Sequence, residues 1–484
     1  MLKYIKYIGF LLLLCIAGVI LLQHLTRPIW FDEAWSIMAY SPLSLVQIYN
    51  SYNAPNNHIL FNIFLHFYLQ SVGNIFPVSE ILFRLPTAFI ALLTSSLMYI
   101  FWKKRIGTKV TFLIVLSFIL SPIFIIYGTA VRGYMLGMLF VLCGLESVLM
   151  FSTSGKRRYI IFFFISSLLG VAVIPSNLFA FVLLIIFPFL QIKNKKSFIP
   201  LLRRNIFILL SPFIAFFLFY GPIYRNLYNA LKYNTGWLHP FSACIHLYSG
   251  LICNMLPITL IAFFLSIILI KHSKIFVIIS IVIIFTAPAL VILWHVPAPF
   301  PRVFLQMWPI WLYLIGVALK HFFAMTRKTN SSRVKYYFYI LVISIISWSI
   351  TSNIFKSKLS KTFTRQFSQD DLFDPYFMKE SFTPSETVKK LVKLTKNHAG
   401  QVFLSHNADF PSIIFYGKLQ GINQNYWLTD TLGKRKINWF SKNKICYILL
   451  RNKEDLLLIE KRFKLQSLQP VIFFGIQKIY KLEN

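Results

Sequence analysis

Apolar runs of about 20 residues recur along the chain from Tyr7 to Phe355. A helix of that length crosses the hydrocarbon core of a bilayer. The composition agrees, because only 13% of the 484 residues are charged and the mean hydropathy is +0.65. A soluble domain carries about 25% charged residues. We therefore expect a polytopic membrane protein and exclude an ordinary soluble globular fold.

The apolar runs predict eleven spanning helices. They lie at 7–25, 80–102, 110–127, 133–151, 159–175, 177–192, 205–220, 250–270, 275–294, 303–320 and 336–355. A further run, 57–72, is short for a span. In it His58, Asn62, His66 and Gln70 recur every four residues and form a polar stripe on one helical face. We expect this helix to lie in the membrane interface.

Basic clusters between the spans predict the orientation. With 57–72 on the surface, 21 Lys and Arg residues gather on one side and six on the other. The positive-inside rule assigns the larger group to the cytoplasm. The N-terminus is then cytoplasmic and the C-terminal part lies outside, although four basic residues after the last span would lie outside too. The net charge of +34 is spread over these clusters. The sequence has no long basic arm of the kind that would indicate nucleic-acid binding, so we do not expect a nucleic-acid partner.

Acidic residues divide the chain. Only Asp32, Glu33, Glu80 and Glu146 precede position 370, and the other eleven of the 15 follow it. We predict an all-α membrane domain (1–355), a linker (356–369) and a small extracytoplasmic α/β domain (370–484). In that domain Thr383-Pro384-Ser385-Glu386 is typical of a helix start. Strand-like runs lie at 401–405, 444–450 and 471–481, and a helical run at 453–463.

Asp32 and Glu33 form the strongest candidate site. They follow the first span, between Trp30 and Trp35, in a loop predicted to face outward. Ionisable residues at a membrane are costly and are functional by default. The alternative is a structural role, with Asp32 capping the next helix. In an extended loop the two adjacent side chains would point apart, so we do not expect them to share a proton.

Four motifs occur in the order of a known enzyme class. They are Phe31-Asp32-Glu33-Ala34-Trp35-Ser36, Asn56-Asn57-His58-Ile59-Leu60, Arg84-Leu85-Pro86 and Arg132-Gly133-Tyr134. Over about the first 310 residues the chain resembles the bacterial multi-span glycosyltransferases of GT-C architecture. These belong with the dolichyl-phosphate-mannose protein mannosyltransferases and the lipid A aminoarabinose transferases. The resemblance implies a surface helix after the acidic loop and, in many relatives, a soluble domain outside the membrane.

The resemblance also implies an activity. The chain would transfer a hexose or pentose, with inversion, from a polyprenyl-phosphate donor to a hydroxyl group of a lipid, glycan or protein. Asp32 would be the general base, a role worth about 10²–10⁴-fold, and Glu33 would support it or contact substrate. The residues implied to bind the donor and its phosphate are His58, Arg132, Tyr134 and Arg302. From the residues alone, each Arg could equally be snorkelling from a helix end, and His58 could be an interfacial polar residue.

Other functions remain open at this point. A transporter or flippase for lipid-linked glycans would bury charges among its spans, whereas here the span centres are nearly free of charge. A polymerase or ligase would lack the early acidic pair, and a binding protein would depend on the C-terminal domain. The five widely spaced cysteines encode neither a disulfide framework nor a zinc site, and no nucleotide-binding fingerprint is present. We expect no cofactor, and dependence on a divalent metal stays open.

The predicted orientation can be tested by labelling. In a variant whose five native cysteines are replaced, a cysteine introduced at Tyr233 or at Lys418 should react with an impermeant maleimide added from outside. The reason is that both positions belong to segments that the basic clusters place outside. Labelling from the cytoplasmic side alone would contradict the eleven-span topology.

Overall fold

The structure, a computed structural model, describes most of the chain. The described residues are 2–52, 57–73, 75–188, 198–233, 241, 244, 286–291, 301–328, 383–395, 402–404, 410–423, 426–429, 445–450, 470–474 and 477–483. The chain divides into two compact units. The helical unit comprises Met1–Leu25, Leu43–Gln70 and Arg84–Asp374, and the sheet unit comprises Thr26–Pro42, Ser71–Phe83 and Pro375–Asn484. The short segments 26–42 and 71–83 thus join the C-terminal residues in one unit.

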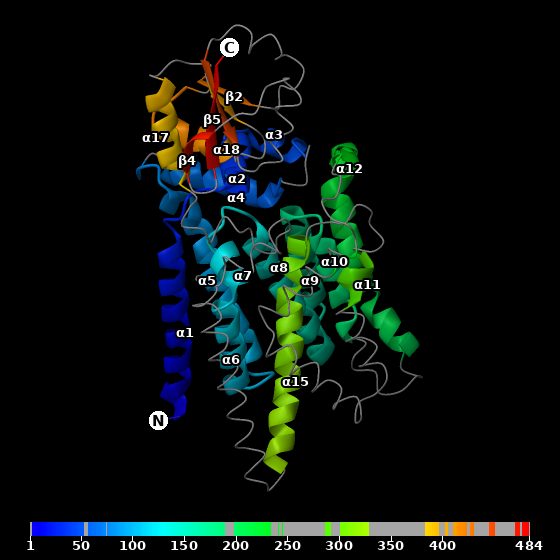
Figure 1. Cartoon of the computed structure of the whole chain (residues 1–484). Coiled ribbons are helices and arrows are strands. Elements are labelled where there is room, and N and C mark those ends of the chain that lie inside the picture. The colour runs from blue at the N-terminus through cyan, green and yellow to red at the C-terminus, as the bar shows by residue number, and fades with distance from the viewer. Residues whose placement is uncertain are drawn as a thin grey trace. The chain divides into compact units, whose positions relative to one another are not determined.

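The described part of the helical unit consists mainly of apolar helices, with the more polar α12 among them. They are α1 (Leu2–His24), α3 (Leu45–Asn50), α4 (Ile59–Val72), α5 (Glu80–Trp102), α6 (Thr108–Ile119), α7 (Pro122–Tyr127), α8 (Tyr134–Ser154), α9 (Arg158–Val173), α10 (Asn177–Leu184), α11 (Phe198–Tyr220), α12 (Tyr224–Tyr233) and α15 (Trp308–Lys328). The ends of α4 and α5 pass into the sheet unit. Two short 3-10 segments, η4 (Gly221–Ile223) and η5 (Pro301–Met307), precede α12 and α15. In Figure 1, the axes of α6 and α15 are nearly parallel, and α15 contacts both α6 and α8.

Four helical stretches in the described part of the chain are long and apolar enough to cross a membrane. They are Glu80–Trp102, Tyr134–Ser154, Asn205–Ala230 and Arg302–Lys320. Shorter apolar helices include Ile8–His24 and Ile59–Val72. The predicted spans 250–270 and 336–355, and most of 275–294, lie outside the described residues. Eleven spans therefore remains a prediction.

One predicted span is divided in the structure. The run 110–127 forms α6 and α7 rather than one helix. Ser121 accepts a hydrogen bond from the Phe124 backbone N–H at 3.3 Å, and Pro122 takes the first helical position. Proline is tolerated there but breaks a helix interior, so a new helix begins at this point. The run 177–192 is also shorter than predicted, because α10 ends at Leu184.

Glycines allow α8, α9 and α10 to pack closely. A Cβ on Gly144 of α8 would lie 2.7 Å from the Phe181 ring of α10, and a Cβ on Gly170 of α9 would also clash with that ring. Phe181 is fully buried and also contacts the Phe163 ring, with centroids 6.0 Å apart. α9 and α10 therefore lie close against the middle of α8.

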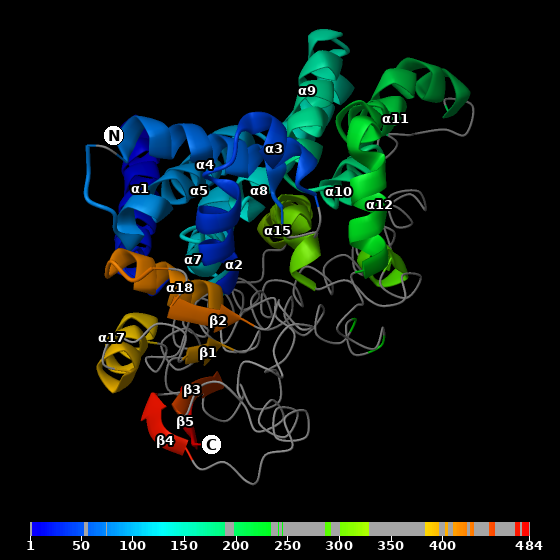
Figure 2. The ribbon, with the colours of Figure 1, turned by 90° about the horizontal axis from the view of Figure 1, so that it is seen from above.

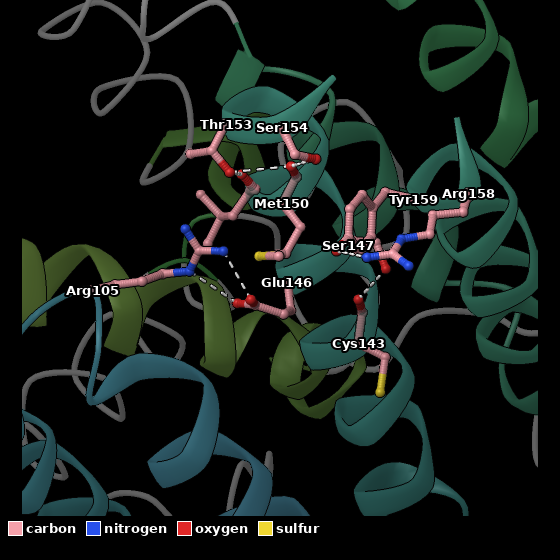
Figure 3. A network of polar contacts seen from close by, with 10 residues as sticks. Arg105, Cys143, Glu146, Ser147, Met150, Thr153, Ser154, Arg158 and Tyr159 are labelled. Carbon is pink, nitrogen blue, oxygen red and sulfur yellow. Dashed lines mark hydrogen bonds and ion pairs between the residues drawn. The ribbon is translucent and has the colours of Figure 1, made fainter. Parts of the chain in front are cut away.

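An ion pair fastens α8 further along its length (Figure 3). Arg105, in the turn between α5 and α6, donates from Nη2 and Nε to the Glu146 carboxylate at 2.8 and 3.1 Å. Lys320 of α15 donates to the Arg105 carbonyl oxygen at 2.6 Å. A bidentate pair of this kind fixes geometry as well as charge, so Glu146 makes a structural contact here.

The sheet unit contains helices and a five-stranded sheet. The strands are β1 (Val402–Leu404), β2 (Trp427–Thr429), β3 (Ile445–Leu450), β4 (Pro470–Phe474) and β5 (Gln477–Glu483). Their order is β2-β1-β3-β5-β4, which Figure 2 shows from above. β1 is parallel to β2 and β3, with Val402 opposite Trp427 and Tyr447, and the β5 pairings are antiparallel. Helices α17 (Pro384–Thr395) and α18 (Phe410–Leu419) pack against each other.

The C-terminal α/β prediction agrees with this unit in kind. α17 begins at Pro384, inside the predicted helix-start motif, and β1 and β3 occupy two predicted strand runs. The run 471–481 is wrong as a single strand, because β4 and β5 are paired antiparallel strands. The helical run 453–463 lies outside the described residues.

Candidate functional site

The acidic pair lies on a short helix, α2 (Phe31–Trp35). Asp32 is 6% exposed and Glu33 is fully buried. The Glu33 carboxylate accepts a hydrogen bond from the Trp30 backbone N–H at 3.2 Å and so closes the first turn. The expectation of an extended loop is therefore wrong, and the capping contact is made by Glu33 rather than by Asp32.

The turn after the acidic pair is wider than an α-helix. η1 (Ser36–Tyr40) is a π-helical turn in which the Ser41 N–H donates to the Ser36 carbonyl oxygen at 3.1 Å. Such turns are rare and occur frequently at functional sites. The acidic pair thus precedes a backbone irregularity that a structural linker does not require.

Tyr416 of α18 holds the segment before α2. Its hydroxyl accepts from the Ile29 backbone N–H at 2.9 Å and donates to the Glu80 carboxylate at 2.8 Å. Beside it, the Phe415 and Phe83 rings meet edge to face, 5.7 Å apart. Three separate stretches of the sheet unit therefore converge on one side chain. No sequence pattern predicted this contact, because Ile29 and Tyr416 are 387 positions apart.

In the helical unit, His58 and Arg132 lie together. His58 directly precedes α4, and Arg132 lies in the turn between α7 and α8. Each is 2% exposed. The His58 Nε2 and Arg132 Nη2 atoms are 3.1 Å apart, and the Gly133 backbone N–H donates to His58 Nδ1 at 2.8 Å. Two of the predicted donor-binding residues are thus direct neighbours.

The Arg132-Gly133-Tyr134 motif has a steric explanation. A Cβ on Gly133 would lie 2.9 Å from His58 Nδ1 and 2.5 Å from Val173 Cγ1, so only glycine permits this approach. The Tyr134 ring meets the His58 ring edge to face at 4.8 Å, and the Arg132 guanidinium lies 5.9 Å from its centroid. We call His58, Arg132, Gly133 and Tyr134 the His58 cluster.

Two asparagines support the cluster from the His58 side. Asn57 donates to the Ile48 carbonyl oxygen at 2.9 Å, and Asn62 donates to Asn57 Oδ1 at 2.8 Å. Both side chains are fully buried. They fix the start of α4 next to His58, a positioning role that the polar stripe on 57–72 did not suggest.

His58 is neutral in this setting. Burial lowers the pKa of His58 well below its usual value, and the charges of Arg132 and Arg302 lower it further. Arg302, near the start of η5, is half-buried. The structure therefore gathers all four predicted donor-binding residues in the helical unit.

The neutral ring fixes where its proton lies. Because Nδ1 accepts from Gly133, the single ring proton belongs on Nε2. Arginine has no acceptor, so Nε2–H and Arg132 Nη2 are two donors 3.1 Å apart. An acceptor that receives a hydrogen bond from both, such as an anionic oxygen, would relieve this arrangement. The cluster is suited chemically to an anion.

The predicted residues fall into two sets. Asp32 and Glu33 belong to the sheet unit, and His58, Arg132, Tyr134 and Arg302 belong to the helical unit. Among the described residues, no three His, Cys, Asp or Glu side chains are grouped as metal ligands would be. The sheet unit by itself offers a buried carboxylate, and the helical unit by itself offers clustered cationic and neutral donors.

Comparison with known proteins gives a match in fold. Neither a protein-family model nor a curated protein sequence matches the chain. Among solved structures it is similar to ArnT from Cupriavidus metallidurans in the apo state, with a TM-score of 0.52 and 11% identity. It is also similar to ArnT bound to undecaprenyl phosphate, with a TM-score of 0.54 and 12% identity. Each comparison covers 97% of both chains. The expected resemblance to GT-C glycosyltransferases is confirmed at the level of fold.

The neutral state of His58 predicts a pH effect on stability. Since the pKa of His58 is lowered in the folded protein, the unfolded chain binds the extra proton first as the pH falls below about 6.5. Stability should fall by up to about 1.4 kcal/mol per pH unit below that value. His58→Gln should remove this part of the loss. We would measure the thermal unfolding midpoints of the wild type and His58→Gln at pH 7.5 and at pH 5.5. If the midpoint falls equally in the two proteins between these pH values, His58 is not held neutral.

Proposed function

We propose that this protein is an inverting glycosyltransferase that moves a sugar from a polyprenyl-phosphate donor to a hydroxyl acceptor. The observation that carries the proposal is the His58 cluster, with buried donors suited to an anion, in a fold similar to that of ArnT, one structure of which holds undecaprenyl phosphate. ArnT is a lipid A aminoarabinose transferase. The acceptor class, a lipid, glycan or protein, stays open.

Asp32 acts as the general base in this proposal. The acceptor oxygen attacks the anomeric carbon while Asp32 takes its proton, and the bond between that carbon and the phosphate oxygen breaks. Attack opposite the leaving group inverts the anomeric centre. Glu33 positions Asp32 by closing the first turn of α2 through the Trp30 N–H.

The leaving lipid phosphate gains negative charge as the bond breaks. Arg132 and Arg302 stabilise that charge, and the His58 Nε2–H donates a further hydrogen bond. Preorganised donors of this kind supply much of the rate enhancement in many enzymes. A guanidinium suits phosphate because its planar fork can bind two oxygens. Tyr134 orients the cluster through its contacts with the His58 ring and the Arg132 guanidinium.

The reaction takes place at the outer face of a bacterial cytoplasmic membrane in this proposal. The distribution of basic residues supports that side, because it assigns the acidic pair and the start of α8 to the outside. A donor carried by a lipid is delivered within the bilayer, which agrees with the absence of a nucleotide-binding fingerprint from the sequence. The alternatives are a transporter, flippase or polymerase of lipid-linked glycans. A donor-turnover assay distinguishes them from the proposed enzyme, because only the transferase releases lipid phosphate while it glycosylates a non-polymeric acceptor.

Asp32→Asn should abolish turnover without loss of folding. The change keeps the side-chain size and removes the base, so release of undecaprenyl phosphate should fall at least about 10²–10⁴-fold. Binding of undecaprenyl phosphate itself should be retained. Glu33→Gln keeps an oxygen that can accept from the Trp30 N–H and should lose less.

The matched control for that experiment is Glu386→Gln. Glu386 is an exposed acid in the first turn of α17, and its variant should keep wild-type turnover. Near-normal turnover in Asp32→Asn would exclude Asp32 as the base.

The arginines can be tested by product inhibition. Arg132→Lys and Arg302→Lys keep the charge but lose the bidentate geometry. A lost charge-assisted hydrogen bond costs about 1.5–3 kcal/mol, so inhibition by free undecaprenyl phosphate should weaken roughly 10–150-fold. Arg225→Lys is the control, because Arg225 lies on α12 and its Nε donates to the neighbouring Tyr224 hydroxyl. Equal inhibition constants in all four proteins would show that neither arginine contacts the phosphate.

A further inference from the structure

Two buried amide side chains meet α8 at the same point. Asn177 begins α10 and is fully buried, and Gln306 lies in η5 and is 1% exposed. A Cβ on Gly137 of α8 would lie 2.8 Å from Asn177 Nδ2 and 3.1 Å from Gln306 Cγ. The Phe179 and Phe304 rings, 6.3 Å apart, bring α10 and η5 together beside them. We call Asn177 and Gln306 the amide pair.

Some hydrogen-bonding atoms of the amide pair are not used by contacts within the described part of the protein. Asn177 Nδ2 donates to the Gly170 carbonyl oxygen at 2.6 Å. Asn177 Oδ1 and both polar atoms of Gln306 have no hydrogen-bond partner among the residues that the structure describes. Buried groups of this kind are nearly always satisfied in native proteins, because each one left unpaired is costly. One donor and two acceptors therefore point to a polar ligand.

The amide pair lies close to the His58 cluster along α8. Gly133 and Gly137 are four residues apart, so they share one face of the helix, with a rise of about 6 Å between them. His58 contacts that face at Gly133 and the amide pair contacts it at Gly137. All of these residues belong to the helical unit. A molecule held by its phosphate at His58 could reach the amide pair with the group attached to that phosphate.

We propose that the amide pair is a subsite for the hydroxyl groups of the transferred sugar. The inference rests on the proposed function and adds the recognition of the donor's sugar. A hydroxyl group both donates and accepts, which matches the combination of one amide N–H and two carbonyl oxygens. Two neutral carbonyl oxygens do not suit a phosphate, and an isoprenoid chain has no group that could use them. Gly137 leaves the space between the two side chains free of a Cβ.

The experiment compares two probes on the purified full-length protein in lipid nanodiscs. One probe is undecaprenyl phosphate, and the other is a panel of undecaprenyl-phosphate sugars carrying glucose, mannose, arabinose or aminoarabinose. At least one sugar-bearing probe should bind the wild type more tightly than the bare lipid phosphate. Gln306→Met keeps the side-chain length and removes both unpaired atoms, so folding should survive. Gln306→Met should weaken binding of that sugar-bearing probe about 10-fold and leave the affinity for bare undecaprenyl phosphate unchanged.

Two further variants complete the test. Gly137→Ala places a Cβ against both amides and should produce the same sugar-dependent loss. Thr87→Val is the control, because the Thr87 hydroxyl on α5 is likewise buried without a partner among the described residues. It should change neither affinity. A purely structural amide pair would affect both probes equally, or neither, in Gln306→Met, and either result overturns the proposal.

The remaining outcomes separate this subsite from the proposed function. If no sugar-bearing probe binds the wild type better than undecaprenyl phosphate, the subsite does not exist. If the sugar-dependent difference is present and is lost in Gln306→Met, but no acceptor is ever glycosylated, the subsite stands and the transferase activity fails. If turnover is normal and Gln306→Met keeps the full difference, the enzyme stands and the subsite fails.

Discussion

The helical-unit site depends on the approach of His58 to the Gly133 backbone. That contact requires a glycine, because a Cβ at position 133 would meet the imidazole. It also sets the ring proton on Nε2, next to the Arg132 guanidinium. Both groups are buried, and hydrogen bonds and charges act more strongly there than in water. A single backbone hydrogen bond thus determines the proton position and the kind of ligand that the cluster suits.

The acidic pair depends on a different support. α2 is only five residues long, and a helix that short has little stability of its own. It is held by packing against α18 and by the Tyr416 hydroxyl, which binds the chain just before it. The two carboxylates have different environments as a result, since Glu33 is used in the helix start while Asp32 retains slight exposure. The different roles proposed for these two adjacent acids rest on this difference.

Local patterns in the sequence predicted local structure, but they could not predict contacts between residues that are distant along the chain. The capping signal at Thr383–Glu386 located the start of α17, and a long apolar run located α5, since both depend on neighbouring residues. The break at Ser121-Pro122 was missed because apolar side chains continue across it. The family resemblance pointed to His58, Arg132 and Arg302, but their grouping depends on the packing of α4, α8 and η5. Asn177 and Gln306 are single polar residues in apolar surroundings, and only the fold shows that they meet.

The Tyr416 contact also bears on how such proteins can diverge. The segment that carries Asp32 is separated in sequence from the C-terminal residues that hold it, yet both belong to one compact unit. Exchange of the C-terminal domain between relatives would therefore replace one partner of α2 and leave the other behind. Recombination that exchanged the C-terminal domain alone would therefore break its contacts with the segment before α2. A change in the acidic segment, in the start of α5 or in the C-terminal domain would therefore meet contact partners from the other two stretches.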